Sequence, residues 1–228
     1  MLASTIHSLL REAVPAARRC NICNRSVLFK PMGWPMRPEA RCPNCGSLER
    51  HRLLKMWFDK ERESIVGKRI LHFAPEPAVS RFLRPLTERY TTADIRPGYD
   101  LRLNIEEIDL PDQNYDLIVC SHVLEHVDDH SALKEMHRVL KVNGIALLMT
   151  PVIEGWSETY EDPTIVEPND RVIHFGQGDH VRYYGANLRE RIRQAGFELE
   201  EFTVEGAAAV EYGLLRGERL FLAIRRQA

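Results

Sequence analysis

Four cysteines near the start of the chain form two pairs, and each pair encloses two residues. The pairs are Cys20 with Cys23 and Cys42 with Cys45, and 18 residues lie between them. A C-x-x-C pair places two thiolates on one tight turn, and two such turns complete the tetrahedral four-sulfur site that Zn²⁺ prefers. Sites of this kind have no open coordination position, so we expect a structural Zn²⁺ ion that takes no part in catalysis.

A redox function is the alternative for these cysteines. It would need one C-x-x-C pair beside a thioredoxin-like βαβ pattern, and no such pattern surrounds either pair. The fifth cysteine, Cys120, ends a mostly apolar run that starts at Asp116. We interpret it as a small core residue of a buried strand, the usual place of an isolated cysteine.

Asp94 is the next residue whose position suggests chemistry. It ends a short segment with strand character and lies 20 residues after Ala74, which ends another. If the two segments are neighbouring strands of a parallel sheet, an acid at this place accepts hydrogen bonds from both hydroxyls of a nucleoside ribose. A helix cap or a surface turn is the alternative use of such an aspartate.

Alternating strands and helices are predicted to position these residues. The predicted strands are residues 69–74, 90–94, 101–103, 115–120, 145–149, 197–204 and 220–224, and the predicted helices are residues 78–86, 131–141 and 187–195. This alternation predicts an α/β fold with a doubly wound sheet. Such sheets bind ligands at the carboxyl ends of their strands.

The composition limits the classes of protein that fit. The chain has 228 residues, of which 44% are hydrophobic and 28% are charged, and its net charge is −2. These values exclude fibrous and wholly disordered chains. No apolar run approaches bilayer length, and charged residues directly follow Leu9 and Leu10, so we expect a cytoplasmic protein with neither a signal peptide nor a membrane segment.

The charge is unevenly distributed along the chain. Residues 1–60 contain 11 Lys and Arg against 4 Asp and Glu, a balance of +7, and the remainder contains 20 against 29, a balance of −9. We therefore expect two parts: residues 1–60, with an N-terminal helix and the four-cysteine head, and residues 61–228, the main domain. A basic head can bind nucleic acid; contact with the acidic remainder of the same chain is the alternative.

Two stretches of the main domain resemble a known family. Residues 110–127 and 132–144 are similar to the fourth-strand region and the following helix of class I S-adenosylmethionine-dependent methyltransferases of type 11. The four-cysteine head and residues 72–76 (His-Phe-Ala-Pro-Glu) resemble a subgroup of that family. The resemblance covers residues 68–150 well and the later strands loosely. It implies a seven-stranded, Rossmann-like methyltransferase sheet whose last strand runs antiparallel.

The resemblance also implies roles for residues after the predicted strands. Asp94 would hold the ribose of S-adenosylmethionine, and Asn104 and Ile105 would flank its adenine. Ser121 and His122, just after the fourth strand, would face the methionine moiety and the methyl acceptor.

The first cofactor-binding motif departs from the family pattern. The family has a glycine-rich turn where this chain has His72, Ala74, Glu76 and Pro77. Ala74 is small enough for close approach of the cofactor, His72 replaces the family acid, and Glu76 is the candidate partner of the cofactor ammonium group. A dehydrogenase would need those glycines for a pyrophosphate, whereas S-adenosylmethionine has no phosphate. A degenerate site that binds no cofactor is the other reading of this departure.

Residues 150–186 are expected to cover the methyl acceptor, because a connection of this length is usually functional. A histidine there can accept a proton, and aromatic side chains can exclude water. The catalytic candidates are His174 and His180, and the acceptor-binding candidates are Trp156, Tyr160, Arg182 and Tyr183. Packing within the protein is the alternative for each histidine, and it is the expected role of His126.

We expect methyl transfer to O or N of a small molecule or biosynthetic intermediate, because the aromatic-rich residues 150–186 would enclose a small acceptor. Holding acceptor and methyl group in line supplies most of the rate enhancement, so the enzyme does not require an evident catalytic base. RNA or protein methylation guided by the basic head is the first alternative. A binding module without catalysis is the second.

Overall fold

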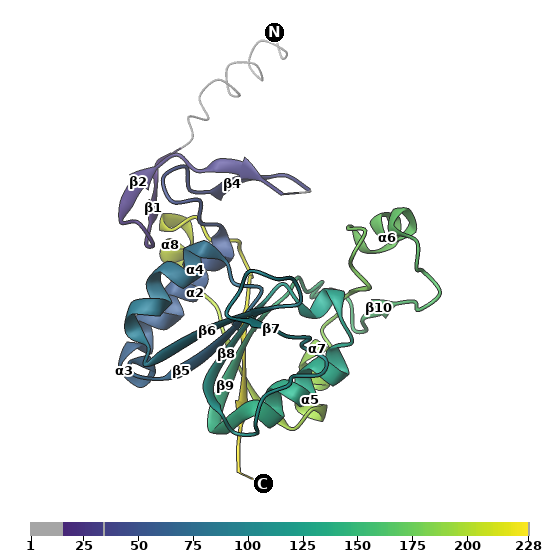
Figure 1. Ribbon diagram of the computed structural model, residues 1–228. Helices are drawn as coiled ribbons and strands as arrows, with labels where there is room; N and C mark the ends of the chain where they lie inside the picture. The colour runs from purple at the N-terminus through teal and green to yellow at the C-terminus, as the bar shows by residue number, and fades with distance from the viewer. Residues whose placement is uncertain (1–15, 34, 228) are drawn as a thin grey trace. The chain divides into compact units, whose positions relative to one another are not determined.

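The computed structural model describes residues 16–33 and 35–227 (Figure 1). These residues form two compact units: residues up to 56 together with 204–218, and residues 57–203 together with 219 onwards. The predicted N-terminal helix and the expected lack of a signal peptide concern residues that lie outside this description.

The first unit is built from short hairpins and two helices. Strands β1 (Arg18–Cys20) and β2 (Arg25–Val27) pair antiparallel, as do β3 (Lys30–Met32) and β4 (Arg37–Arg41). Helix α2 (Glu49–Lys60) starts in this unit, and α8 (Gly206–Glu211) belongs to it.

Arg52 on α2 joins the two chain segments of the first unit. Its side chain is fully buried. The guanidinium donates hydrogen bonds to the carbonyl oxygens of Ala40 and Ser47. It also donates to the carbonyl oxygens of Tyr212 and Gly213, at 2.8 and 2.7 Å. One buried side chain therefore satisfies four carbonyl groups and holds residues 204–218 against the cysteine-bearing segment.

The second unit contains a seven-stranded sheet. Its strands are β5 (Arg69–Phe73), β6 (Arg89–Asp94), β7 (Leu101–Arg102), β8 (Tyr115–Ser121), β9 (Leu140–Met149), β12 (Phe197–Phe202) and β13 (Leu220–Arg225). They lie in the order β12-β13-β9-β8-β5-β6-β7. Only β13 runs antiparallel to its neighbours, β9 and β12. The predicted doubly wound sheet with an antiparallel last strand is confirmed.

Helices cover both faces of this sheet (Figure 1). Helices α5 (Asp129–Val139) and α7 (Leu188–Gln194) lie on one side, and α3 (Arg62–Ile65), α4 (Pro77–Leu83) and the 3₁₀ turn η1 (Arg84–Leu86) lie on the other. Leu133, Met136 and Val139 recur at helical spacing on α5 and are fully buried. They pack in one apolar cluster with residues of β5, β8, β9 and β13, which fixes the helix on the sheet.

The prediction was wrong at the junction of α5 and β9. The sequence predicts a helix over residues 131–141, but the helix ends at Val139, and β9 begins at Leu140. Leu140 pairs with Tyr115, and the register then shifts along β9. Asn143 lies where the register shifts and has a φ of 61°. The Asn-Gly pair therefore belongs to a strand bulge rather than to a helix terminus.

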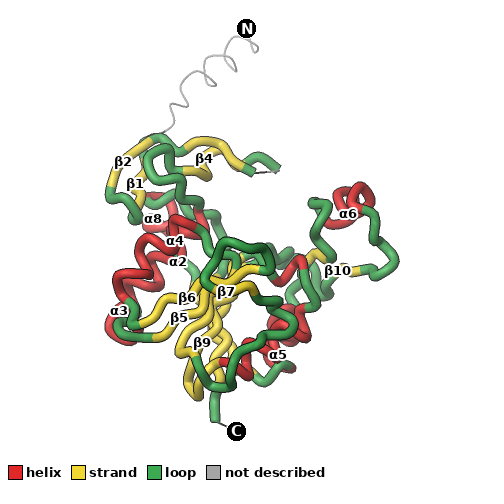
Figure 2. The backbone as a smooth tube through the Cα atoms, in the orientation of Figure 1, coloured by secondary structure: helices red, strands yellow, loops and turns green. Residues whose placement is uncertain are grey.

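The connection between β9 and α7 contains little regular structure (Figure 2). It includes β10 (Tyr160–Glu161), α6 (Pro168–Phe175) and β11 (Arg182–Tyr183), and β10 pairs antiparallel with β11. A further 3₁₀ turn, η2 (Leu124–His126), follows β8. Across the described ranges, no helix is long and apolar enough to cross a bilayer.

Candidate functional site

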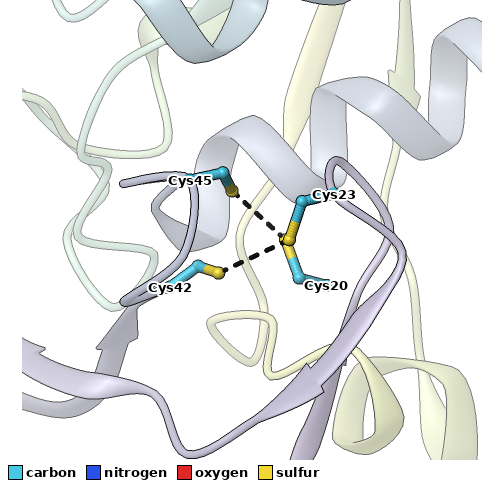
Figure 3. A group of neighbouring side chains, drawn as sticks. All are labelled: Cys20, Cys23, Cys42 and Cys45. Atoms are coloured by element: carbon cyan, nitrogen blue, oxygen red, sulfur yellow. Dashed lines mark hydrogen bonds between the residues drawn. The ribbon is translucent and has the colours of Figure 1, made fainter.

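The four paired cysteines converge on one point in the first unit (Figure 3). The Sγ atoms of Cys20 and Cys45 lie 3.6 Å apart, and those of Cys23 and Cys42 lie 3.8 Å apart. Tetrahedral Zn²⁺ with Zn–S bonds of about 2.3 Å requires sulfur separations of about 3.8 Å. The donor set and its spacing therefore fit a zinc ion, which these four side chains would hold.

The second site lies at the carboxyl edge of the large sheet, where β5, β6 and β8 end. Phe73 on β5 is level with Ala93 on β6 and with Cys120 on β8. The next residue on each strand, Ala74, Asp94 and Ser121, therefore reaches the same edge at the same height. The chain order reverses between β5 and β8, which is the switch point where doubly wound sheets bind ligands.

Ala74 turns the chain sharply after β5. Its φ is 44°, in the left-handed region that glycine adopts more easily than any other residue. Its backbone N–H donates to the carbonyl oxygen of Ala93 at 2.9 Å. The backbone thus makes a glycine-type turn without a glycine. The Ala74 side chain is only a methyl group, so a ligand could approach the backbone closely.

Asp94 presents a fixed carboxylate at this edge. Its side chain is 5% exposed, and its two oxygens accept hydrogen bonds from the Arg96 guanidinium at 3.0 Å each. These bonds hold the pKa of the Asp94 carboxyl below its usual range. The Arg96 side chain is 72% exposed, so it can move aside or share the carboxylate with ribose hydroxyls.

Ser121 and His122 follow β8. The Ser121 Oγ is buried and has no hydrogen-bond partner among the described residues. A buried hydroxyl without a partner is costly, and a polar ligand group would satisfy it. His122 has a φ of 54°, and its Nδ1 lies 3.0 Å from a carboxylate oxygen of Glu125.

The other predicted cofactor residues occupy different surroundings. Glu76 precedes α4 in an extended conformation, and Ile105 is buried beside the exposed Asn104. His72 is fully buried, and its Nδ1 lies 2.6 Å from the Tyr90 hydroxyl. Burial raises the pKa of Tyr90 to about 12, so the phenol keeps its proton at neutral pH. The cofactor roles of these residues stay predictions.

The residues at the ends of β5, β6 and β8 fit S-adenosylmethionine. Asp94 would hold the ribose, the turn at Ala74 would admit the cofactor backbone, and Ser121 would bind the polar methionine end. This fit rests on a buried carboxylate, a left-handed turn and a hydroxyl that has no hydrogen-bond partner within residues 16–33 and 35–227.

Most predicted acceptor-binding residues gather in the connection between β9 and α7. Tyr160 is level with Tyr183 across the β10–β11 pair, and the Trp156 ring meets the Tyr183 ring edge-on. The Tyr160 hydroxyl lies 2.6 Å from Nδ1 of His174 at the end of α6. Tyr160, Trp156 and His174 are exposed. The roles of these residues in catalysis or acceptor binding stay predictions.

Arg182 is instead buried in a network of charged groups. Its guanidinium donates to Glu161 at 2.7 Å and lies 3.5 Å from Asp129. It also donates to the carbonyl oxygens of Leu124 and Val127. These contacts tie β11 to η2 and α5. The predicted role of Arg182 in acceptor binding stays a prediction.

A cavity of about 550 Å³ lies beside this network. Arg182 and Asp129 line it together with residues of α7 and of the β9–α7 connection. None of the predicted cofactor residues is among the residues that line it.

His180 lies next to η2. Its ring is buried, its Nδ1 lies 3.1 Å from the carbonyl oxygen of Phe175, and burial lowers its pKa. Its ring centroid is 4.7 Å from that of His126. The structure therefore groups His180 with His126 and Glu125, a grouping that sequence reasoning missed because some 54 residues separate its members.

Comparison with known proteins agrees with this geometry. Residues 72–148 match a family model described as a methyltransferase domain. A Mycolicibacterium smegmatis protein named "Probable S-adenosylmethionine-dependent methyltransferase" is 30% identical over 138 residues, which are 60% of this chain and 46% of that protein. The Xanthomonas campestris protein named ubiquinone/menaquinone biosynthesis C-methyltransferase UbiE is 41% identical over 79 residues, 33% of this chain and 31% of the relative.

The chain spans less than half the length of these two relatives. A solved S-adenosylmethionine-dependent methyltransferase from Mesorhizobium loti superposes with a TM-score of 0.53 at 15% identity and covers 76% of this chain and 100% of that one. That likeness concerns the fold. Residues 72–148 thus match the methyltransferase-domain family, and the sheet that contains them has the Rossmann-like methyltransferase fold.

Proposed function

We propose that this protein is an S-adenosylmethionine-dependent methyltransferase that acts on O or N of a small-molecule or biosynthetic acceptor. The observation that carries the proposal is the common level of Ala74, Asp94 and Ser121 at the switch point of the sheet. The small turn at Ala74 would admit the cofactor backbone, and the fixed carboxylate of Asp94 suits its ribose. The Ser121 hydroxyl, which has no partner among the described residues, suits its methionine end.

The bound cofactor supplies an electrophilic methyl carbon on a sulfonium. The protein's task is to hold an acceptor in line with that carbon, which is worth up to about 7–11 kcal/mol in favourable cases. Asp94, Ala74 and Ser121 would hold the cofactor, its methyl group would pass to the acceptor atom, and the acceptor proton would pass to a base of this chain or to water. His180 and His174 are the proposed proton acceptors, and Trp156, Tyr160 and Tyr183 would exclude water.

A small acceptor is favoured over RNA because several basic side chains of the head form ion pairs or hydrogen bonds within the head itself. Arg18 pairs with Glu39 at 2.6 Å, and Arg37 pairs with Glu49 at 2.8 Å. Arg52 is buried among carbonyl groups. Three of the cations that create the positive balance are thus engaged inside the unit, which leaves less charge for phosphate contacts.

Transfer to carbon is the second candidate reaction. The observation that favours it is that the Xanthomonas campestris relative is named a C-methyltransferase and is similar over 33% of this chain. A carbon acceptor would need the same cofactor site and a base that removes a proton from carbon before or during transfer.

Calorimetry with S-adenosylmethionine and its demethylated product tests the proposal, with Asp94→Asn as the test variant. Loss of two hydrogen bonds to a charged acceptor predicts a Kd that is roughly ten- to a hundredfold weaker. Glu200→Gln, which neutralises an exposed carboxylate on β12, is the matched control and should bind as the wild type does. Absence of heat with either ligand in folded, zinc-loaded wild-type protein would favour the non-catalytic alternative.

A further inference from the structure

A second group of metal-ligating side chains lies beside the candidate methyl-transfer site. Glu125 and His126 belong to η2, and His180 lies in the β9–α7 connection. One carboxylate oxygen and one ring nitrogen from each histidine all lie within 4.8 Å of one another. Ligands of one metal ion at about 2.1 Å lie at most about 4.2 Å apart, so small ring rotations would bring all three into bonding distance.

Both histidine rings are held by their Nδ1 atoms. The His126 Nδ1 lies 3.2 Å from the carbonyl oxygen of Asp179, and the His180 Nδ1 lies 3.1 Å from that of Phe175. A carbonyl oxygen can only accept, so each Nδ1 carries the proton, and each Nε2 carries a lone pair. Neither Nε2 has a hydrogen-bond partner within the part of the chain that the structure describes. Fixing Nδ1–H on a carbonyl is how proteins orient histidines that bind a metal through Nε2.

The carboxylate of the group is fixed in the same manner. Glu125 is 2% exposed, and its two oxygens contact the Nδ1 of His122 at 3.0 Å and the hydroxyl of Thr150 at 2.9 Å. A carboxylate has about four acceptor positions, so two contacts leave room for a metal bond. A backbone bond from Val181 to the Glu125 carbonyl oxygen, at 2.9 Å, holds the His180 segment next to η2.

We propose that Glu125, His126 and His180 bind a divalent first-row transition-metal ion. Two imidazoles and one carboxylate suit Mn²⁺, Fe²⁺, Co²⁺ or Zn²⁺, whereas the four thiolates of the head select Zn²⁺. Three protein ligands leave coordination positions for water or for an oxygen of another molecule. The site is therefore an open one, unlike the closed site of the cysteines.

The position of the group indicates what the ion would do, and this step rests on the proposed function. Glu125 follows Ser121 by four residues, and Thr150 directly follows β9, so the group adjoins the edge where the methyl carbon would lie. With the ion bound, His180 would be a metal ligand and could not accept the proton, but an acceptor hydroxyl bound to the ion would lose its proton to water more readily. Its oxygen would then bond to the methyl carbon, leaving the sulfur as a thioether. The site would thus select hydroxyl acceptors.

Manganese binding tests the site without any acceptor. Full-length, zinc-loaded protein is titrated with Mn²⁺, and free Mn²⁺ is followed by electron paramagnetic resonance. We expect one Mn²⁺ per chain in the wild type and at least tenfold weaker binding in Glu125→Gln and His180→Ala. His126→Gln, at a half-buried position, provides a third variant that should fold even if the other two do not. His130→Ala, an exposed histidine on α5, is the matched control and should bind as the wild type does.

The same preparations separate this inference from the proposed function. Wild-type protein that binds S-adenosylmethionine but no Mn²⁺ up to millimolar concentration would overturn the metal site and leave the methyltransferase proposal intact. Equal Mn²⁺ binding by wild type and by folded His126→Gln would overturn it as well. Mn²⁺ binding without S-adenosylmethionine binding would support the metal site and count against the methyltransferase.

Discussion

At the scale of single residues, Ala74 shows how a changed motif keeps its backbone shape. The sequence already marked the missing glycines as a departure, and the structure shows that the turn persists with a φ of 44°. The left-handed conformation costs a non-glycine residue roughly 1–2 kcal/mol. That cost is local and falls at the turn where β5 ends at the switch point of the sheet.

Replacing Ala74 with glycine should therefore not destabilise the protein. Relief of the left-handed strain outweighs the greater flexibility of an unfolded glycine, so we expect the free energy of unfolding to rise by up to about 1 kcal/mol. Ala207→Gly, at an exposed position in α8, should have the opposite effect and lower it by roughly 0.5–1 kcal/mol. Urea unfolding of both variants measures the difference; destabilisation by Ala74→Gly would show that the turn is not strained.

Some of the site was predictable from the residues, and some was not. Asp94 and Ser121 follow apolar strands, so parallel pairing alone brings them to one edge. The grouping of Glu125, His126 and His180 has no local signal, because it depends on how the β9–α7 connection folds back on η2. His174 and His180 were given one role from the sequence, yet they make different contacts.

At the scale of elements, the β9–α7 connection is held by a network of charged groups as well as by the buried Phe175 and Tyr184. Arg182 and Arg191 both contact Asp129, which is almost fully buried, and both contact Glu161. A buried carboxylate between two arginines is stable only while its partners remain. The residues that could enclose an acceptor therefore depend on this network for their position.

Substituting Arg182 with methionine should loosen this connection. It leaves Asp129 with one cation fewer and removes two bonds to backbone carbonyls, so we expect a loss of about 3 kcal/mol in the free energy of unfolding. Limited proteolysis should then cut residues 150–186 faster. Arg226→Met removes an exposed pair with Glu198 and is the control that should change neither property. Unchanged proteolysis of Arg182→Met would show that the network does not hold the connection.

Strands were the most predictable elements, and their junctions were the least. The apolar segments of the sequence located all seven strands of the sheet, because a strand buried on one or both faces has a recognisable pattern of apolar residues. The start of β9 was misplaced, since the Asn-Gly pair that commonly ends a helix here forms a bulge. Residues 204–218 carry no pattern that links them to the cysteine-bearing segment; the link is made by Arg52, whose bonds go to backbone carbonyls.

At the scale of the whole molecule, the chain combines a methyltransferase-type sheet with a cysteine-bearing unit. The charge balance of +7 in residues 1–60 and the paired cysteines indicated a separate unit from the sequence alone. The apolar cluster around the cysteines of that unit is small: of the described residues, only Cys20, Phe29 and Cys42 are buried in it, and its other members are half-buried. Units with so few apolar residues usually need a metal ion to fold.

Substitution of Cys42, one of the four cysteines proposed to bind zinc, should unfold the first unit. We expect Cys42→Ser to contain one zinc ion fewer per chain than the wild type by elemental analysis, and to lose hydrogen-exchange protection in β1 to β4. Cys120→Ser alters a buried cysteine of β8 and should keep the wild-type zinc content. A metal-free wild-type preparation with full protection in β1 to β4 would contradict a structural zinc ion.

The most direct measurement is a crystal structure of the protein with the demethylated product of S-adenosylmethionine. We expect both ribose hydroxyls on the Asp94 carboxylate, the ligand backbone against Ala74, and the sulfur beside Ser121 and His122. A ligand bound elsewhere, or a strand edge that protein side chains keep filled at saturating ligand, would contradict it.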